Sequence, residues 1–123
     1  MLELIFATMV LYVVQLMLPN SLAQMRKDAA LSYYLGNRDT DVTVSELPGR
    51  AQRAVRNLQE SLFLFLPLAV LAVSSGASAT EAAAVWFGLR IAYLISYLMG
   101  LAYVRTAIWM ASLVCLYLMA AAL

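Results

Sequence analysis

The segment 50–73 constrains the fold most, because a polar helical stripe runs into an apolar run without a break. At 100° per residue, the polar side chains fall within one arc of about 120° on a helix. They are Arg50, Arg53, Arg56, Asn57 and Glu60. The apolar run 62–73 measures only about 18 Å, so a hydrocarbon core of about 30 Å draws the two preceding turns into the membrane. Ionisable side chains at that depth usually face a bundle interior or an aqueous cavity, which makes this stripe a candidate site.

The composition is that of an integral membrane protein with one domain. Of the 123 residues, 64% are hydrophobic and 12% are charged, whereas about a quarter of the residues in soluble domains are charged. The chain has no His and one Cys, so it lacks the ligands for a metal cage and the pairs for a disulfide framework. Its net charge of +1 gives no reason to expect nucleic acid as a partner.

Four apolar stretches predict an all-α fold of four transmembrane helices, at about 2–35, 48–74, 80–104 and 106–123. The first helix needs its full length, since residues 4–18 alone span about 22 Å, and we expect a kink at Pro19. Gly36 is its expected C-cap, and a polar loop follows to residue 47. The rival interpretation of the first run is a cleaved signal peptide, but the chain begins without a positively charged region.

The basic residues predict the orientation of the bundle. The first connection carries four of them: Arg26, Lys27, Arg38 and Arg50. Arg105 stands at the third connection, between the last two helices, whereas the second connection, 74–80, has no basic residue. The positive-inside rule therefore places the first and third connections in the cytoplasm and both termini on the outside of the membrane.

Arg53, Asn57 and Glu60 follow one another at i, i+4 and i+7 along the second helix. One interpretation is an ion-pair network that pins this helix to its neighbours, with Arg50 and Arg56 reaching to lipid headgroups. The other is a ligand site. A single Arg–Glu pair would already satisfy the charges, so the additional cations and the amide favour an anionic ligand.

Arg90, Tyr93 and Tyr97 stand at i, i+3 and i+7 along the third helix. A lone arginine inside an apolar run costs about 2.5–3.5 kcal/mol on insertion scales, so it needs a partner. The obvious partner within the chain is Glu60, and the alternative is a ligand. The two tyrosines could also be interfacial belt residues, although both fall on the Arg90 face. Arg105, taken alone, is equally explained as a charge that sets topology.

Three groups of residues, in this order along the chain, resemble the MAPEG family, the membrane-associated proteins in eicosanoid and glutathione metabolism. They are the polar residues of the second helix, the Arg90 face of the third helix, and Arg105. The second-helix motif reads Arg50-x-x-Arg53-Ala54-x-x-Asn57-x-x-Glu60 and continues to Pro67. Arg90-x-x-Tyr93-x-x-x-Tyr97 follows, and then Arg105 near Trp109, so the resemblance covers all four helices. The loop at 35–39 and the compact length look like the bacterial branch of this family.

The resemblance implies a left-handed four-helix bundle that assembles as a homotrimer, with glutathione bound between subunits at the cytosolic side. The residues expected to contact glutathione are Arg53, Asn57, Glu60, Arg90, Tyr93 and Tyr97. Arginine suits the two carboxylates of glutathione and Glu60 suits its amine. Arg105 looks like the arginine that stabilises the thiolate. The thiolate would then attack a lipophilic electrophile that arrives from the bilayer.

The chain also departs from the pattern of the glutathione-conjugating synthases, which carry an aromatic residue in place of Ser61 and a polar one in place of Val55. Two functions therefore stay open. The first is a glutathione-dependent transferase or peroxidase of the bacterial inner membrane. The second is a non-catalytic lipid-binding or accessory subunit of a larger membrane complex. A small multidrug exporter is set aside, because such exporters need a titratable carboxylate in mid-membrane of the first helix, and the only acid at the apolar run 4–18 is Glu3, at its extreme end.

Overall fold

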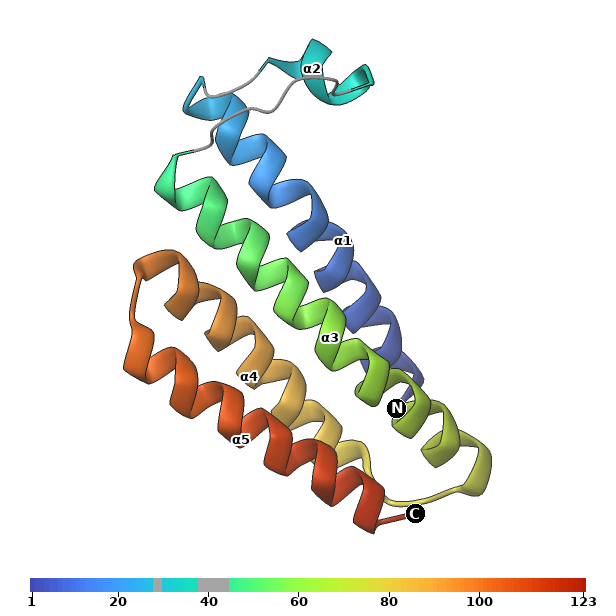
Figure 1. Cartoon of the computed structure of the whole chain (residues 1–123). Helices are drawn as coiled ribbons and strands as arrows, with labels where there is room; N and C mark the ends of the chain where they lie inside the picture. Colours follow the sequence, from blue (N-terminus) through green and yellow to red (C-terminus); the bar gives the residue numbers. More distant parts are fainter. Residues whose placement is uncertain (28–29, 38–44) are drawn as a thin grey trace.

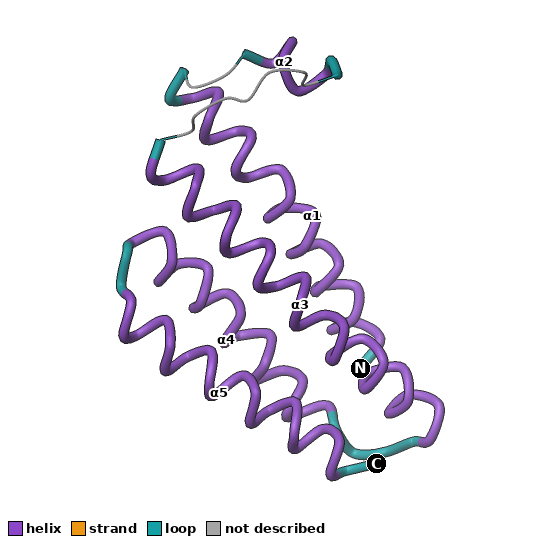
Figure 2. Tube along the Cα trace, in the orientation of Figure 1, coloured by secondary structure: helices purple, strands orange, loops and turns teal. Residues whose placement is uncertain are grey.

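The computed structural model describes residues 1–27, 30–37 and 45–123. Figures 1 and 2 show its described residues as helices joined by loops and turns. The helices are α1 (Leu2–Met25), α2 (Leu31–Leu35), α3 (Glu46–Ser75), α4 (Thr80–Met99) and α5 (Ala102–Ala121). All except the short α2 are long and apolar enough to cross a membrane. The predicted all-α membrane bundle of four long helices is therefore confirmed.

The long helices form two closely packed pairs, α1 with α3 and α4 with α5, and α3 also contacts both α4 and α5. Figure 1 shows both termini at the end of the bundle where the α3–α4 turn lies. The α4–α5 turn lies at the opposite end, together with the end of α1 and the start of α3. Helix α3 thus connects the two halves of the bundle.

The first helix is shorter than the predicted 2–35, because it ends at Met25. The N–H of Arg26 still donates to the carbonyl of Leu22, but Lys27 has a φ of 60°. This left-handed conformation cannot continue a right-handed helix. Gly36 therefore follows the separate helix α2. Most of the predicted polar loop, residues 38–44, lies outside the described residues, as do residues 28–29.

The last two helices meet earlier than predicted, at Gly100, which has a φ of 76°. Its N–H donates to the carbonyl of Tyr97, and the N–H of Leu101 donates to that of Ser96. This is the Schellman pattern with which glycine ends many helices. Helix α4 consequently ends at Met99 instead of residue 104, and Arg105 lies in the first turn of α5 instead of in the connection.

The apolar core lies in the half of the bundle that is remote from the α4–α5 turn. At its centre, the Phe65 ring of α3 stacks on the Trp86 ring of α4, with centroids 3.9 Å apart and an interplanar angle of 6°. Alanines surround this stack and let the helices approach closely. The buried core residues are Leu58, Phe65, Ala69, Ala72, Ala79, Ala83, Trp86, Cys115, Leu116 and Met119. The other half of the bundle contains the polar residues singled out in the sequence.

Candidate functional site: a polar groove along α3, α4 and α5

The predicted site residues come from three helices and lie towards the α4–α5 turn. Three cavities, of about 210, 290 and 140 Å³, have Asn57 as a common lining residue. We call the first two of them together the polar groove. It is lined by Arg53, Arg56, Asn57, Glu60, Tyr93, Tyr97, Arg105, Thr106 and Trp109. All the predicted site residues except Arg90 therefore line one groove.

Helical spacing explains why α3 presents its polar residues to this groove. The buried residues of α3 recur every three or four positions, as in Ala54, Leu58 and Ser61. Arg53, Asn57 and Glu60 each lie one residue before these positions, so they fall on the adjacent face of the helix. The polar stripe therefore runs along the edge of the packed face, where a groove can form between α3 and its neighbours.

Arg90 is the buried cation of this region, with 1% of its surface exposed. Its Nη2 donates to Oδ1 of Asn57 at 2.8 Å, and its guanidinium lies 4.4 Å from the centroid of the Tyr93 ring. Its Nε and Nη1 have no hydrogen-bond partner among the described residues. Since a buried charge is costly unless it is paired, Arg90 supplies an uncompensated positive charge directly behind the groove wall.

The prediction that Glu60 forms an ion pair with Arg90 is wrong. Within the described part of the chain, the one ion pair joins Arg50 to Glu46, and Glu60 lies exposed at the wall of the groove. The reason is the axial register of the two helices. Arg90 lies level with Asn57, and Glu60 stands almost one helical turn farther along α3. Asn57, and not Glu60, is therefore the residue that pairs with Arg90.

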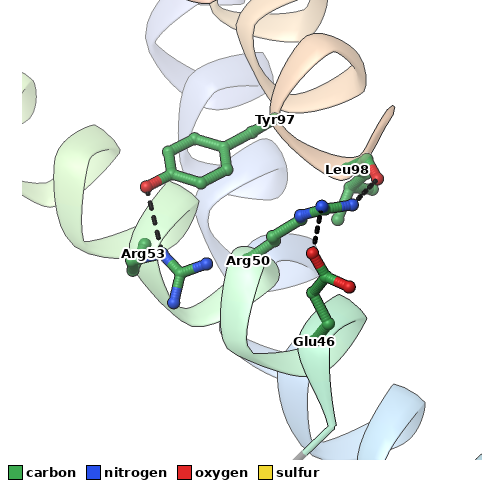
Figure 3. Close-up of polar contacts among 5 residues, drawn as sticks. All are labelled: Glu46, Arg50, Arg53, Tyr97 and Leu98. Carbon is green, nitrogen blue, oxygen red and sulfur yellow. Dashed lines mark hydrogen bonds and ion pairs between the residues drawn. The ribbon is translucent and has the colours of Figure 1, made fainter. Parts of the chain in front are cut away.

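Tyr97 joins two arginines from different helices. Nε of Arg53 donates to its hydroxyl at 3.2 Å, as Figure 3 shows. The guanidinium of Arg105 lies 4.3 Å from the centroid of the same ring, a favourable cation–π arrangement. The ring of Tyr93 stands edge-on to that of Tyr97, with centroids 5.7 Å apart. The two tyrosines thus hold cations from α3, α4 and α5 around one polar centre.

The charge balance of the groove is strongly positive. Among its lining residues, three arginines face one glutamate, and Arg90 adds a further cation behind them. Such clusters attract anions, and low-dielectric walls strengthen the attraction. Glu60 supplies one acceptor for a cationic group. The groove therefore suits a ligand that is anionic overall and carries several acceptors together with one amine.

Thr106 is not among the predicted site residues, and Trp109 is predicted only as a neighbour of Arg105. Both line the cavity at Arg105, and the i+4 spacing from Arg105 to Trp109 was the available signal. Ser61 contributes to the smallest cavity, and its buried Oγ has no hydrogen-bond partner among the described residues.

The comparisons with curated proteins and with solved structures give no match. The comparison with protein families does, because the sequence model of the MAPEG family matches residues 4–123. This range contains α3, α4 and α5 in full and all but the first two residues of α1. It also contains every residue of the polar groove. The chain therefore belongs to the MAPEG family.

Proposed function

We propose that this protein is a membrane-bound, glutathione-dependent transferase or peroxidase that acts on lipophilic electrophiles. The observation that carries the proposal is the surplus of arginine around the polar groove, with buried Arg90 lacking a counter-charge. Glutathione has the matching chemistry, since it carries two carboxylates, an amine and a thiol. Family membership supports the same class of co-substrate.

Each part of glutathione has a complementary group in the groove. Arg53 offers a planar donor pair to a carboxylate, and Glu60 offers an acceptor to the amine. Because arginine only donates, the oxygen of Asn57 is committed to Arg90. The amide nitrogen of Asn57 is then free to donate to a ligand carboxylate. In this proposal, Arg90 acts through Asn57 and through its charge, and Tyr93 and Tyr97 complete the polar wall.

Arg105 is the residue that we assign to the thiol. An arginine cannot take up a proton in a protein, so it serves as a fixed cation that favours the thiolate. In a transfer reaction, the thiolate sulfur forms a bond to an electrophilic carbon, and the leaving group departs with its electron pair. In a peroxidase reaction, the sulfur attacks the terminal oxygen of a hydroperoxide and becomes a sulfenic acid, while the O–O bond breaks and the alkoxide leaves and takes up a proton to form the alcohol. A second glutathione then gives the disulfide and water.

A separate apolar cavity supports a lipophilic second substrate. It measures about 410 Å³ and is lined by Phe63, Leu64, Pro67, Leu68, Leu113, Leu116, Tyr117 and Ala120. Leu64 and Leu113 also line the 140 Å³ cavity that contains Asn57 and Glu60. An apolar molecule from the bilayer can therefore lie between α3 and α5 with one end close to the polar groove.

The openness of the groove supports the homotrimer that we propose. Each groove cavity is smaller than the range of about 300–1,000 Å³ typical of ligand sites, and Arg53, Arg56 and Glu60 are exposed. A second copy of the chain would supply the missing wall. The basic residues at the end that holds the groove support a cytoplasmic site, with the termini in the periplasm of a bacterial inner membrane.

Glutathione titration of the detergent-solubilised protein tests this function. We expect saturable binding, together with the ultraviolet absorbance of a bound thiolate at neutral pH. Arg105→Ala should abolish the thiolate absorbance and change the Kd by less than about tenfold, because the carboxylate contacts remain. Arg105→Lys should be intermediate, since it keeps a cation without the planar fork.

Failure to bind glutathione would contradict the proposal. If the wild-type protein is not retained on glutathione-agarose and elutes with other membrane proteins, the second function, an accessory or lipid-binding subunit, is favoured. Binding without thiolate absorbance would leave Arg105 as a charge that only sets topology.

A further inference from the structure

The C-terminal end of α4 receives an unusual cap from another helix. The last four carbonyls of a helix lack partners within that helix. Here the glycine turn uses the carbonyls of Ser96 and Tyr97. The next carbonyl, that of Leu98, accepts from Nη1 of Arg50 at 3.5 Å (Figure 3). A cation at this position also interacts favourably with the helix dipole.

The guanidinium of Arg50 lies directly against Gly100. A Cβ placed on Gly100 would lie 3.0 Å from Nη2 of Arg50, and 3.1 Å from both Cζ and Nη1. Nη2 also donates to the carboxylate of Glu46, one turn earlier on α3, and this ion pair holds the guanidinium in place. Gly100 is therefore required twice, once for its φ of 76° and once for this close approach.

This contact joins α3 to the turn that carries two groove residues. Tyr97 lies three residues before Gly100, and Arg105 lies five residues after it. Arg53 lies almost one turn along α3 from Arg50, and it donates to the Tyr97 hydroxyl. Arg50 thus binds the backbone of α4 at Leu98, and Arg53 binds the side chain of the preceding residue, Tyr97, as Figure 3 shows.

We propose that Arg50, Gly100 and Glu46 form a clasp that fixes the α4–α5 turn against α3 and thereby positions Tyr97 and Arg105 in the polar groove. Arg50 is a positioning residue, because it acts on the groove through the turn. The clasp itself follows from these contacts alone. Its effect on glutathione rests on the proposed function.

The chain offers a matched control at the opposite end of the bundle. Gly76 ends α3 with a φ of 72°, and the N–H of Ala77 donates to the carbonyl of Ala72. A Cβ on Gly76 would meet no atom within 4 Å. Gly76→Ala and Gly100→Ala therefore impose the same kind of backbone strain, but only Gly100→Ala displaces a guanidinium.

The first measurement does not depend on glutathione. Spin labels are attached to cysteines introduced at the exposed positions Gln52 and Tyr103, in a Cys115→Ala background diluted with unlabelled protein. Double electron–electron resonance then reports the distance between α3 and α5. We expect Arg50→Ala and Gly100→Ala to broaden and lengthen this distance distribution. Gly76→Ala should leave it unchanged, and Arg50→Lys should be intermediate.

The second measurement tests the consequence for chemistry. Misplacement of catalytic groups by about 1 Å can cost on the order of 100-fold in rate. We expect Arg50→Ala and Gly100→Ala to lower thiolate formation and turnover by about 10- to 100-fold. Gly76→Ala should lose a similar amount of thermal stability but retain turnover within about twofold. A merely structural role for Arg50 would lower stability and leave thiolate formation in the folded protein unchanged.

The two measurements separate the two proposals. Unchanged distances in both Arg50→Ala and Gly100→Ala would overturn the clasp, whatever glutathione does. Changed distances in a protein that does not bind glutathione would support the clasp and overturn the proposed function. Changed distances with unaffected thiolate formation would show that the clasp does not position Arg105.

Discussion

The same three helices, α3, α4 and α5, make a closed apolar core at one end of the bundle and an open polar groove at the other. In the core, Phe65 and Trp86 are fully buried and stack on each other. In the groove, the guanidinium of Arg105 lies 4.3 Å from the centroid of the Tyr97 ring, but it keeps donors that no described residue uses. The difference indicates that the core end stabilises the fold and that the groove end is organised for a ligand.

Burial alone does not distinguish the two ends, because Arg90 is as buried as Trp86. What distinguishes them is whether the unpartnered buried group carries a charge. The indole N–H of Trp86 also lacks a partner among the described residues, but it is neutral and the rest of the ring gains by leaving water, whereas two guanidinium nitrogens of Arg90 lie charged in the interior without partners. A residue of the first kind contributes stability, and a residue of the second kind reduces it until an anion compensates the charge.

The largest expected effect comes from Trp86→Ala. Removing a fully buried ring leaves a cavity and should lower the free energy of unfolding by about 3–5 kcal/mol. Thermal unfolding in detergent measures the loss. Trp109→Ala is the matched control, since Trp109 lies at the groove and is 38% exposed. It should lose less than about 1.5 kcal/mol. Equal losses at the two tryptophans would show that the groove end is also a stabilising core.

Much of this arrangement could be predicted from helical periodicity. The spacing of Arg53, Asn57 and Glu60 places them on one face of α3, and hydropathy locates the four long helices. Periodicity fixes the angle of a residue around its helix, but it leaves the axial offset between two helices open. The expected partner of Arg90 was therefore one turn wrong, Glu60 in place of Asn57.

The ends of α1 and α4 were not predicted correctly, for a related reason. Gly100 and Lys27 end their helices through left-handed backbone conformations. A lysine gives little signal of such a conformation, and an isolated glycine inside an apolar run resembles a packing residue. The sequence offers lipid headgroups as one partner of Arg50, because the contact that it makes in the fold lies 48 residues away, at Leu98. Only the folded arrangement brings this arginine to the turn.

A double-mutant cycle tests the axial register between α3 and α4, which pairs Arg90 with Asn57. We expect Asn57→Ala and Arg90→Leu to be coupled by about 0.5–3 kcal/mol in the free energy of unfolding, because their side chains share a hydrogen bond. Glu60→Ala with Arg90→Leu should be additive within about 0.5 kcal/mol. The reverse result would restore the Glu60–Arg90 pair and place the groove one turn farther along α3.

The smallest expected effect comes from Arg56→Gln. It distinguishes an exposed charge at the groove wall from the buried charge of Arg90 behind the wall. Arg56 is exposed at the groove wall, and no described residue forms an ion pair with it. Its contribution to anion binding is therefore screened by water and salt. Arg56→Gln should weaken glutathione binding by less than about 1 kcal/mol, or roughly fivefold. Isothermal titration at low and high ionic strength measures this loss.

The salt dependence makes this small effect informative. At about 1 M salt the Debye length falls to about 3 Å, so the difference between the wild type and Arg56→Gln should vanish. Arg90→Leu serves as the comparison, because a buried charge is screened much less by salt. Its loss of affinity should persist at high ionic strength. If both losses of affinity vanish at high salt, solvent ions reach Arg90, and the groove attracts anions only through screened charges, as an exposed protein surface does. If the Arg90 loss alone persists, recognition depends on a cation that the bundle keeps away from water.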